Sequence, residues 1–87
     1  MRIVKVSAVW CSACLIMNKI WKEIETEEKL EVESLDLDMN EEEVKKYNVG
    51  EKLPEVIFLN DEDEEIGRLI GEHTKKEILE YMRGLNV

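Results

Sequence analysis

The sequence predicts an α/β fold in which helices flank a mixed four-stranded sheet, with the element order β-α-β-α-β-β-α. Its 87 residues suit one domain, and 44% hydrophobic with 38% charged residues is typical of a globular chain. The spacing of apolar residues switches repeatedly between the period of a strand and that of a helix. Helix-capping signals also stand at residues 40–43 and 74–77. We therefore expect a single domain over residues 1–87.

The first half of the chain has the pattern of strand, helix and strand. Residues 2–9 are rich in β-branched side chains and are predicted to form a strand. Residues 12–29 carry apolar side chains at helical spacing, and we place Trp21 among them in the core. Residues 30–38 are predicted as a second strand, whose register stays open because its alternation slips near the end. A β-α-β unit has a right-handed crossover, so the two strands are expected to be parallel.

The second half has the pattern of a helix, a hairpin and a helix. Asn40 is expected to cap a short helix with an acidic first turn, and Gly50 to end it in the left-handed conformation. Residues 55–59 and 66–70 are predicted as strands joined by a short acidic turn. Thr74 opens the last helix, whose apolar side chains are Ile78, Tyr81, Met82 and Leu85.

The charge of the chain excludes several classes of partner. Twelve basic against 21 acidic residues leave a net charge of −9, which argues against binding nucleic acid or anionic membranes. No uninterrupted apolar run approaches the length that spans a bilayer, and the N-terminus lacks the pattern of a signal peptide. We therefore expect a cytoplasmic protein, and a monomer.

Two cysteines, Cys11 and Cys14, stand three residues apart where the first predicted strand gives way to the first predicted helix. Free N–H groups and the helix dipole favour negative charge at that point, so a Cys11 thiolate is stabilised there. Cys14 lies one turn further into the helix and is expected to be shielded. This asymmetry predicts that Cys11 attacks a substrate disulfide and that Cys14 then attacks Cys11 to release the reduced product.

Two other interpretations of the cysteine pair stay open. The pair could be half of a zinc site, although four ligands are usual and His73 is the one remaining nitrogen donor. Such a site would have to be shared between two copies of the chain. The cysteines could also be inert core residues, which a strand-to-helix turn makes less favourable. His73 itself is interpreted as a surface residue near a helix start and not as a catalytic base.

The sequence W-C-S-A-C at residues 10–14, followed later by Leu53-Pro54 before a strand, resembles the thioredoxin superfamily. Residues 49–58 resemble the segment around that family's cis-proline, and residues 70–75 resemble the glycine-bearing end of its last strand. The resemblance covers nearly the whole chain and lacks only the extra N-terminal strand and helix of full-length thioredoxins. It implies a minimal thioredoxin-like fold.

The resemblance also implies roles for residues around the cysteines. Pro54 would be cis and packed against the cysteine pair, which leaves the backbone of Leu53 free to pair with an extended substrate. From the residues alone, Pro54 could instead be an ordinary strand-entry residue. Trp10 would shield the site and help to dock substrates, and Gly71 would join the substrate-binding surface. The implied activity is the reduction of protein disulfides without a bound metal or organic cofactor, with electrons from a thioredoxin-reductase-type donor.

The chain departs from the thioredoxin pattern at several positions. The dipeptide between the cysteines is Ser12-Ala13 instead of the Gly-Pro of thioredoxins, so the reducing strength is not implied. Lys5 stands where thioredoxins have a buried aspartate used in proton transfer, and Ser34 and Ser7 replace a neighbouring lysine and a tryptophan. The Lys5 ammonium is expected either to reach water or Glu55, or to favour the Cys11 thiolate by its charge.

Two further functions compete with a protein-disulfide reductase. One is a glutaredoxin-like enzyme that uses glutathione, which the short chain favours. The acidic surface and Glu51 near the proline weigh against it. The other is a non-catalytic thioredoxin-like binding module that holds a metal through its two cysteines.

Overall fold

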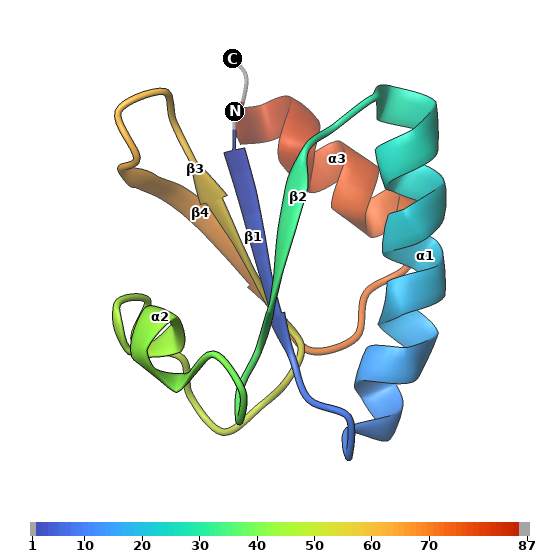
Figure 1. The fold of residues 1–87 in the computed structure, drawn as a ribbon. Helices are drawn as coiled ribbons and strands as arrows, with labels where there is room; N and C mark the ends of the chain where they lie inside the picture. The colour runs from blue at the N-terminus through green and yellow to red at the C-terminus, as the bar shows by residue number, and fades with distance from the viewer. Residues whose placement is uncertain (1, 86–87) are drawn as a thin grey trace.

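The structure of the chain, a computed structural model, describes residues 2–85, and within them a four-stranded sheet carries three helices (Figure 1). The strand order is β2-β1-β3-β4. The pair β1/β2 is parallel, whereas β1/β3 and β3/β4 are antiparallel. The predicted mixed sheet and element order are confirmed. The elements in chain order are β1 (Arg2–Ser7), α1 (Ser12–Glu28), β2 (Val32–Asp36), α2 (Glu41–Lys45), β3 (Glu55–Leu59), β4 (Glu65–Ile70) and α3 (Lys75–Leu85).

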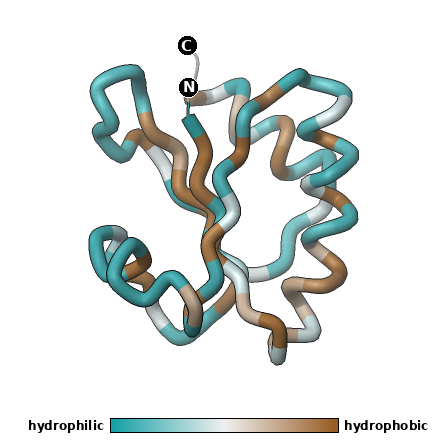
Figure 2. The backbone as a smooth tube through the Cα atoms, viewed as in Figure 1, coloured by the Kyte–Doolittle hydropathy of each residue, from teal (hydrophilic) through white to brown (hydrophobic). Residues whose placement is uncertain are grey.

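Helices cover both faces of the sheet. Helices α1 and α3 lie side by side on one face, and the short α2 lies on the other (Figure 1). Since successive side chains of a strand point to opposite faces, β1 directs Ile3 toward α1 and Val4 toward α2. Figure 2 shows the resulting pattern, with hydrophobic stretches along the strands and hydrophilic residues at the tip of the β3–β4 hairpin.

The core has two parts, one on each face. The α1/α3 face buries Trp21 completely, as predicted, and its ring lies 6.1 Å from that of Phe58. The part on this face consists of Ile3, Met17, Trp21, Ile24, Val56, Phe58, Ile78 and Met82. The other part lies on the α2 face and extends to the start of α1, and it consists of Val4, Val6, Ala8, Cys14, Leu35, Val44, Leu53, Ile57 and Leu59.

The first strand ends two residues earlier than predicted. β1 stops at Ser7, and the Cys11 N–H donates to the Ala8 carbonyl oxygen at 3.1 Å, which closes a turn. Val9 and Trp10 lie on this turn and are 81% and 62% exposed. The β-branched Val9 therefore extends the strand pattern in the sequence beyond the strand itself.

Two expectations about the short helix α2 are wrong. Asn40 makes no side-chain cap, because its Oδ1 accepts the N–H of Asp36 at 2.9 Å and so closes the turn that follows β2. The left-handed residue after α2 is Asn48, with φ of 51°, and not Gly50. Asparagine tolerates this conformation better than most residues.

In the part of the chain that the structure describes, no helix combines the length and apolarity needed to cross a membrane.

Candidate active site

Cys11 is the N-cap residue of α1. Its backbone is extended (φ −94°, ψ 110°), and its Sγ accepts the N–H of Cys14 at 3.3 Å. This N–H is one of those that the first turn of a helix leaves without a backbone partner. Cys11 is partly exposed, and both cysteines are free thiols. The sulfur of Cys11 thus lies at the positive end of α1 and is reachable from solvent.

Cys14 has the opposite environment, because it is only 1% exposed. Burial, and then its hydrogen bond with Cys11, raise the pKa of the Cys14 thiol from 9.0 to about 11. The positive charge of Lys5 acts in the other direction and lowers it. Cys14 is therefore a protonated thiol near neutral pH and has to lose its proton before it can act as a nucleophile.

The loop before β3 reaches the cysteines directly. The peptide bond between Leu53 and Pro54 is cis, and the Cys11 thiol lies 3.8 Å from the Leu53 carbonyl oxygen. The Pro54 carbonyl oxygen accepts the N–H of Gly71 at 2.9 Å. Gly71 has φ of +84°, and a Cβ there would lie 2.9 Å from Lys52 Cε, so glycine suits this position. The structure thus brings Cys11, Leu53, Pro54 and Gly71 to one place.

Trp10 lies on the exposed turn beside Cys11 and is held by a residue that the sequence analysis missed. Its Nε1–H donates to Asp38 Oδ2 at 2.8 Å. Strands β1 and β2 are parallel, so the segments that follow them leave the sheet at the same end, where the carboxyl ends of both strands lie. The position of Asp38, an acidic residue two positions after β2, was the signal from which this contact with Trp10 could have been predicted.

Lys5 is buried on the face of the sheet that α1 covers, close enough to Cys14 for their charges to interact. It is 6% exposed and alternates with Val4 and Val6, which face α2. Burial lowers the pKa of Lys5, while the negative charges of Glu25 and of a Cys14 thiolate act to raise it.

The expectation that Lys5 pairs with Glu55 is wrong. In the register of β1 and β3, Lys5 is opposite Val56 and Val6 is opposite Glu55, so the two charged side chains point to opposite faces. Glu55 pairs instead with Arg68 at 2.9 Å. The contacts of Glu55 and Arg68 were also missed by the sequence analysis, because they depend on the register of β3 and β4 and on the path of the loop before β3.

His73 is partly buried and does not join the cysteines in a hydrogen bond or metal cluster. Its Nε2 lies 3.1 Å from the Ile70 carbonyl oxygen. Within residues 2–85, no group of three or more His, Cys, Asp or Glu side chains is arranged to hold a metal ion.

A buried and an accessible thiol at the start of one helix, facing a cis-proline loop, define a protein of the thiol-redox class. The thioredoxin family model matches residues 1–84, and the chain belongs to the thioredoxin family. A comparison with curated protein sequences finds no match.

Solved structures show the same fold. A reduced thioredoxin pre-protein of Schistosoma mansoni is 23% identical, with a TM-score of 0.85 over 97% of this chain and 77% of that one. A malarial protein is 20% identical, with a TM-score of 0.86 over 99% of this chain and 97% of that one. Thioredoxin-2 of a malaria parasite, described as a component of the protein secretion machinery, is 20% identical, with a TM-score of 0.85 over 95% and 81%.

Proposed function

We propose that this protein is a thiol–disulfide oxidoreductase that reduces protein disulfides. The observation that carries the proposal is the difference between the two sulfurs. Cys11 is accessible and accepts a helix N–H, whereas Cys14 is buried and has a raised pKa. One sulfur is therefore suited to attack a substrate and the other to act only in a second, intramolecular step.

In the first step, the Cys11 thiolate attacks one sulfur of the substrate disulfide. A bond forms between Cys11 and that sulfur, the substrate S–S bond breaks, and the other substrate sulfur leaves as a thiolate. In the second step, Cys14 loses its proton and attacks Cys11 Sγ. The mixed disulfide breaks, the substrate leaves as a dithiol after taking up two protons, and Cys11 and Cys14 become a disulfide. Two electrons have then passed to the substrate, and a thioredoxin-reductase-type donor restores them.

The proposed substrate-binding surface surrounds Cys11. The Leu53 backbone would pair with an extended segment of the substrate, with Pro54 and Gly71 beside it. Trp10 is 62% exposed and is fixed by Asp38, so it offers an oriented apolar surface to a docking chain. The proposal needs no bound metal or organic cofactor. The proposed compartment is the cytoplasm, where a reducing environment keeps such thiol pairs reduced.

Lys5 is proposed to modulate the Cys14 thiolate by its positive charge. Its ammonium lowers the pKa of Cys14, which favours the proton loss that the second step requires.

A disulfide-reduction assay tests the proposal. Insulin is the protein disulfide, and electrons come either from NADPH with thioredoxin reductase or from glutathione with its reductase. We expect rapid insulin reduction with thioredoxin reductase and slow reduction with glutathione. Faster turnover with glutathione would favour the glutaredoxin-like alternative. Failure to reduce insulin with either donor, together with tight zinc in the purified protein, would favour the metal-binding module.

A further inference from the structure

The segment that presents Leu53 and Pro54 lies outside the sheet. Residues 46–54 connect α2 to β3 and belong to no helix or strand. We call them the proline loop. A loop of this kind keeps one conformation only if groups outside it hold its backbone.

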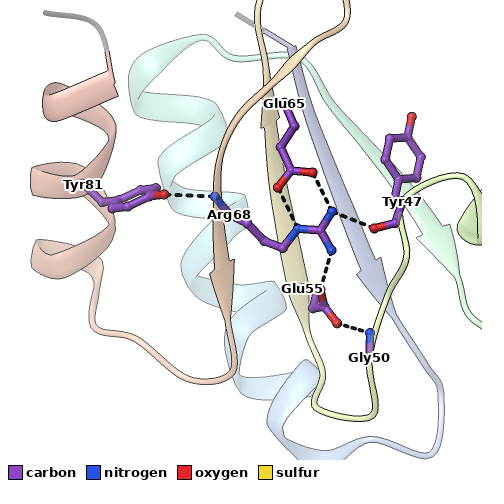
Figure 3. A network of polar contacts seen from close by, with 6 residues as sticks. All are labelled: Tyr47, Gly50, Glu55, Glu65, Arg68 and Tyr81. Carbon is purple, nitrogen blue, oxygen red and sulfur yellow. Dashed lines mark hydrogen bonds and ion pairs between the residues drawn. The ribbon is translucent and has the colours of Figure 1, made fainter.

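Glu55 holds the proline loop from the first position of β3. Its side chain is 2% exposed, although it is a carboxylate. Glu55 Oε2 accepts the N–H of Gly50 at 2.6 Å, and Glu55 Oε1 accepts Arg68 Nη1 at 2.9 Å (Figure 3). The buried charge is thus compensated by one loop N–H and one guanidinium.

Arg68 holds the loop at a second point, closer to α2. Its Nη2 donates to the Tyr47 carbonyl oxygen at 2.6 Å and to Glu65 Oε1 at 2.6 Å, and its Nε donates to Glu65 Oε2 at 3.0 Å (Figure 3). The two bonds to one carboxylate fix the plane of the guanidinium. Arg68 therefore reaches the loop from β4 in a defined orientation.

The position of Arg68 is fixed in turn by α3. β4 is an edge strand, so its outward N–H groups lack a strand partner, and the N–H of Arg68 donates to the Tyr81 hydroxyl oxygen at 2.9 Å (Figure 3). A continuous set of hydrogen bonds thus joins Tyr81, Arg68 and Glu55 to the loop at Tyr47 and Gly50.

We propose that the Glu55–Arg68 pair positions the proline loop so that the Leu53 backbone can pair with an extended protein substrate. The inference rests on the proposed function and adds a substrate distinction to it. A protein disulfide needs the backbone of the loop for docking, whereas a small disulfide needs only access to Cys11. Loss of the pair therefore affects the first substrate selectively.

Three variants and a control test this role. Arg68→Met and Glu55→Leu each remove one charge, and the single changes leave a buried group without its partner. The double variant E55L/R68M removes both charges, so no lone buried charge is left, and neither new side chain can hydrogen-bond the loop. Arg2→Met is the control. Arg2 pairs with Glu33 and Asp63, and it is the first residue of β1, whereas the cysteines follow the other end of that strand.

The measurements are KM and kcat for insulin, the rate constant for a small aromatic disulfide, and amide hydrogen exchange of Gly50 and Leu53. In the double variant we expect KM for insulin to rise about tenfold. A change of this size corresponds to the binding free energy of one or two lost hydrogen bonds. The rate constant for the small disulfide and kcat should stay within about twofold. Exchange at Gly50 should accelerate while exchange in β1 stays unchanged.

Two results would overturn the inference. One is an unchanged KM for insulin in a folded double variant. The other is an equal loss with both disulfides and faster exchange throughout the chain, which would mean general destabilisation. If the wild-type protein reduced neither disulfide, the proposed function would fail, and the exchange at Gly50 would decide the positioning role alone.

Discussion

Cys14 is the residue in which local structure and proposed chemistry are most closely linked. Burial and the hydrogen bond with Cys11 raise its pKa to about 11, so only a small fraction is ionised near neutral pH. A protonated Cys14 does not compete with Cys11 for substrates. The same property slows the second step unless a nearby group helps the proton to leave.

The variant Lys5→Met tests whether the buried ammonium supplies this help. It keeps an unbranched apolar side chain and removes the positive charge that lowers the pKa of Cys14. The pKa of Cys14 should therefore rise further, and at a fixed pH below 11 fewer molecules carry the thiolate. We expect release of a substrate from its mixed disulfide with Cys11 to become about tenfold slower. The measurement is the release rate against pH, which should shift to higher pH.

Lys19→Met is the matched control, because Lys19 is exposed on α1 and the change in net charge is the same. An unshifted pH profile in Lys5→Met would contradict the proposed role and leave Lys5 as a structural residue. The alkylation rate of Cys11 against pH, measured in the same two variants, tests the expectation that Lys5 favours the Cys11 thiolate.

Residues whose contacts are local in the chain were predictable, and those with distant partners were not. Cys11 and Cys14 are adjacent on one helical turn, so their spacing alone indicated a joint site. Two partners of Arg68, Tyr47 and Glu55, lie 21 and 13 residues away in the chain, and no sequence period links them to it. The Glu55 carboxylate is buried, although glutamate is usually exposed. The sequence pattern therefore did not indicate its partner, and Lys5 was expected in place of Arg68.

At the scale of the elements, long periodic segments were more predictable than short ones. Helix α1 follows its apolar spacing and starts at the predicted residue, Ser12. Helix α2 has five residues, and its ends depend on turn contacts that the sequence does not reveal. Asn40 was expected to cap the helix because asparagine accepts helix N–H groups. The N–H of Asp36, the last residue of β2, donates to the same oxygen instead.

The packing of α3 on β4 gives a prediction at this scale. A Cβ on Gly67 would lie 2.5 Å from the Tyr81 hydroxyl oxygen and 2.9 Å from Leu85 Cδ2. Because that hydroxyl accepts the Arg68 N–H, relief of the overlap requires the Tyr81 and Leu85 side chains, or α3 itself, to shift from these contacts. We expect Gly67→Ala to lower the free energy of unfolding by about 1–3 kcal/mol in chemical denaturation.

Gly84→Ala is the control within the same helix. Nothing lies within 4 Å of a Cβ at Gly84, so this change should leave the stability unchanged or raise it by up to about 1 kcal/mol. A Gly67→Ala variant as stable as the wild type would show that α3 is not held closely against β4.

At the scale of the whole molecule, the sheet order brings three distant segments together at one end. The strand β1 is central and leads into Trp10 and Cys11, and its neighbour β3 begins directly after Pro54. β4 ends before Gly71, whose N–H returns to Pro54. Antiparallel pairing of β3 with both β1 and β4 is what places the start of β3 at the ends of its neighbours. The element order in the sequence was sufficient to predict this fold, but not the contacts that hold the loop.

The central claim is that Cys11 is the attacking sulfur and Cys14 the resolving one. Trapping with a protein disulfide in the variants Cys11→Ser and Cys14→Ser tests it most directly, with the products separated without reductant and the linked cysteine identified by mass spectrometry. We predict that Cys14→Ser accumulates a stable mixed disulfide through Cys11, because no second thiol can release it, and that Cys11→Ser forms none. A mixed disulfide through Cys14 in Cys11→Ser, with none through Cys11 in Cys14→Ser, would contradict the claim.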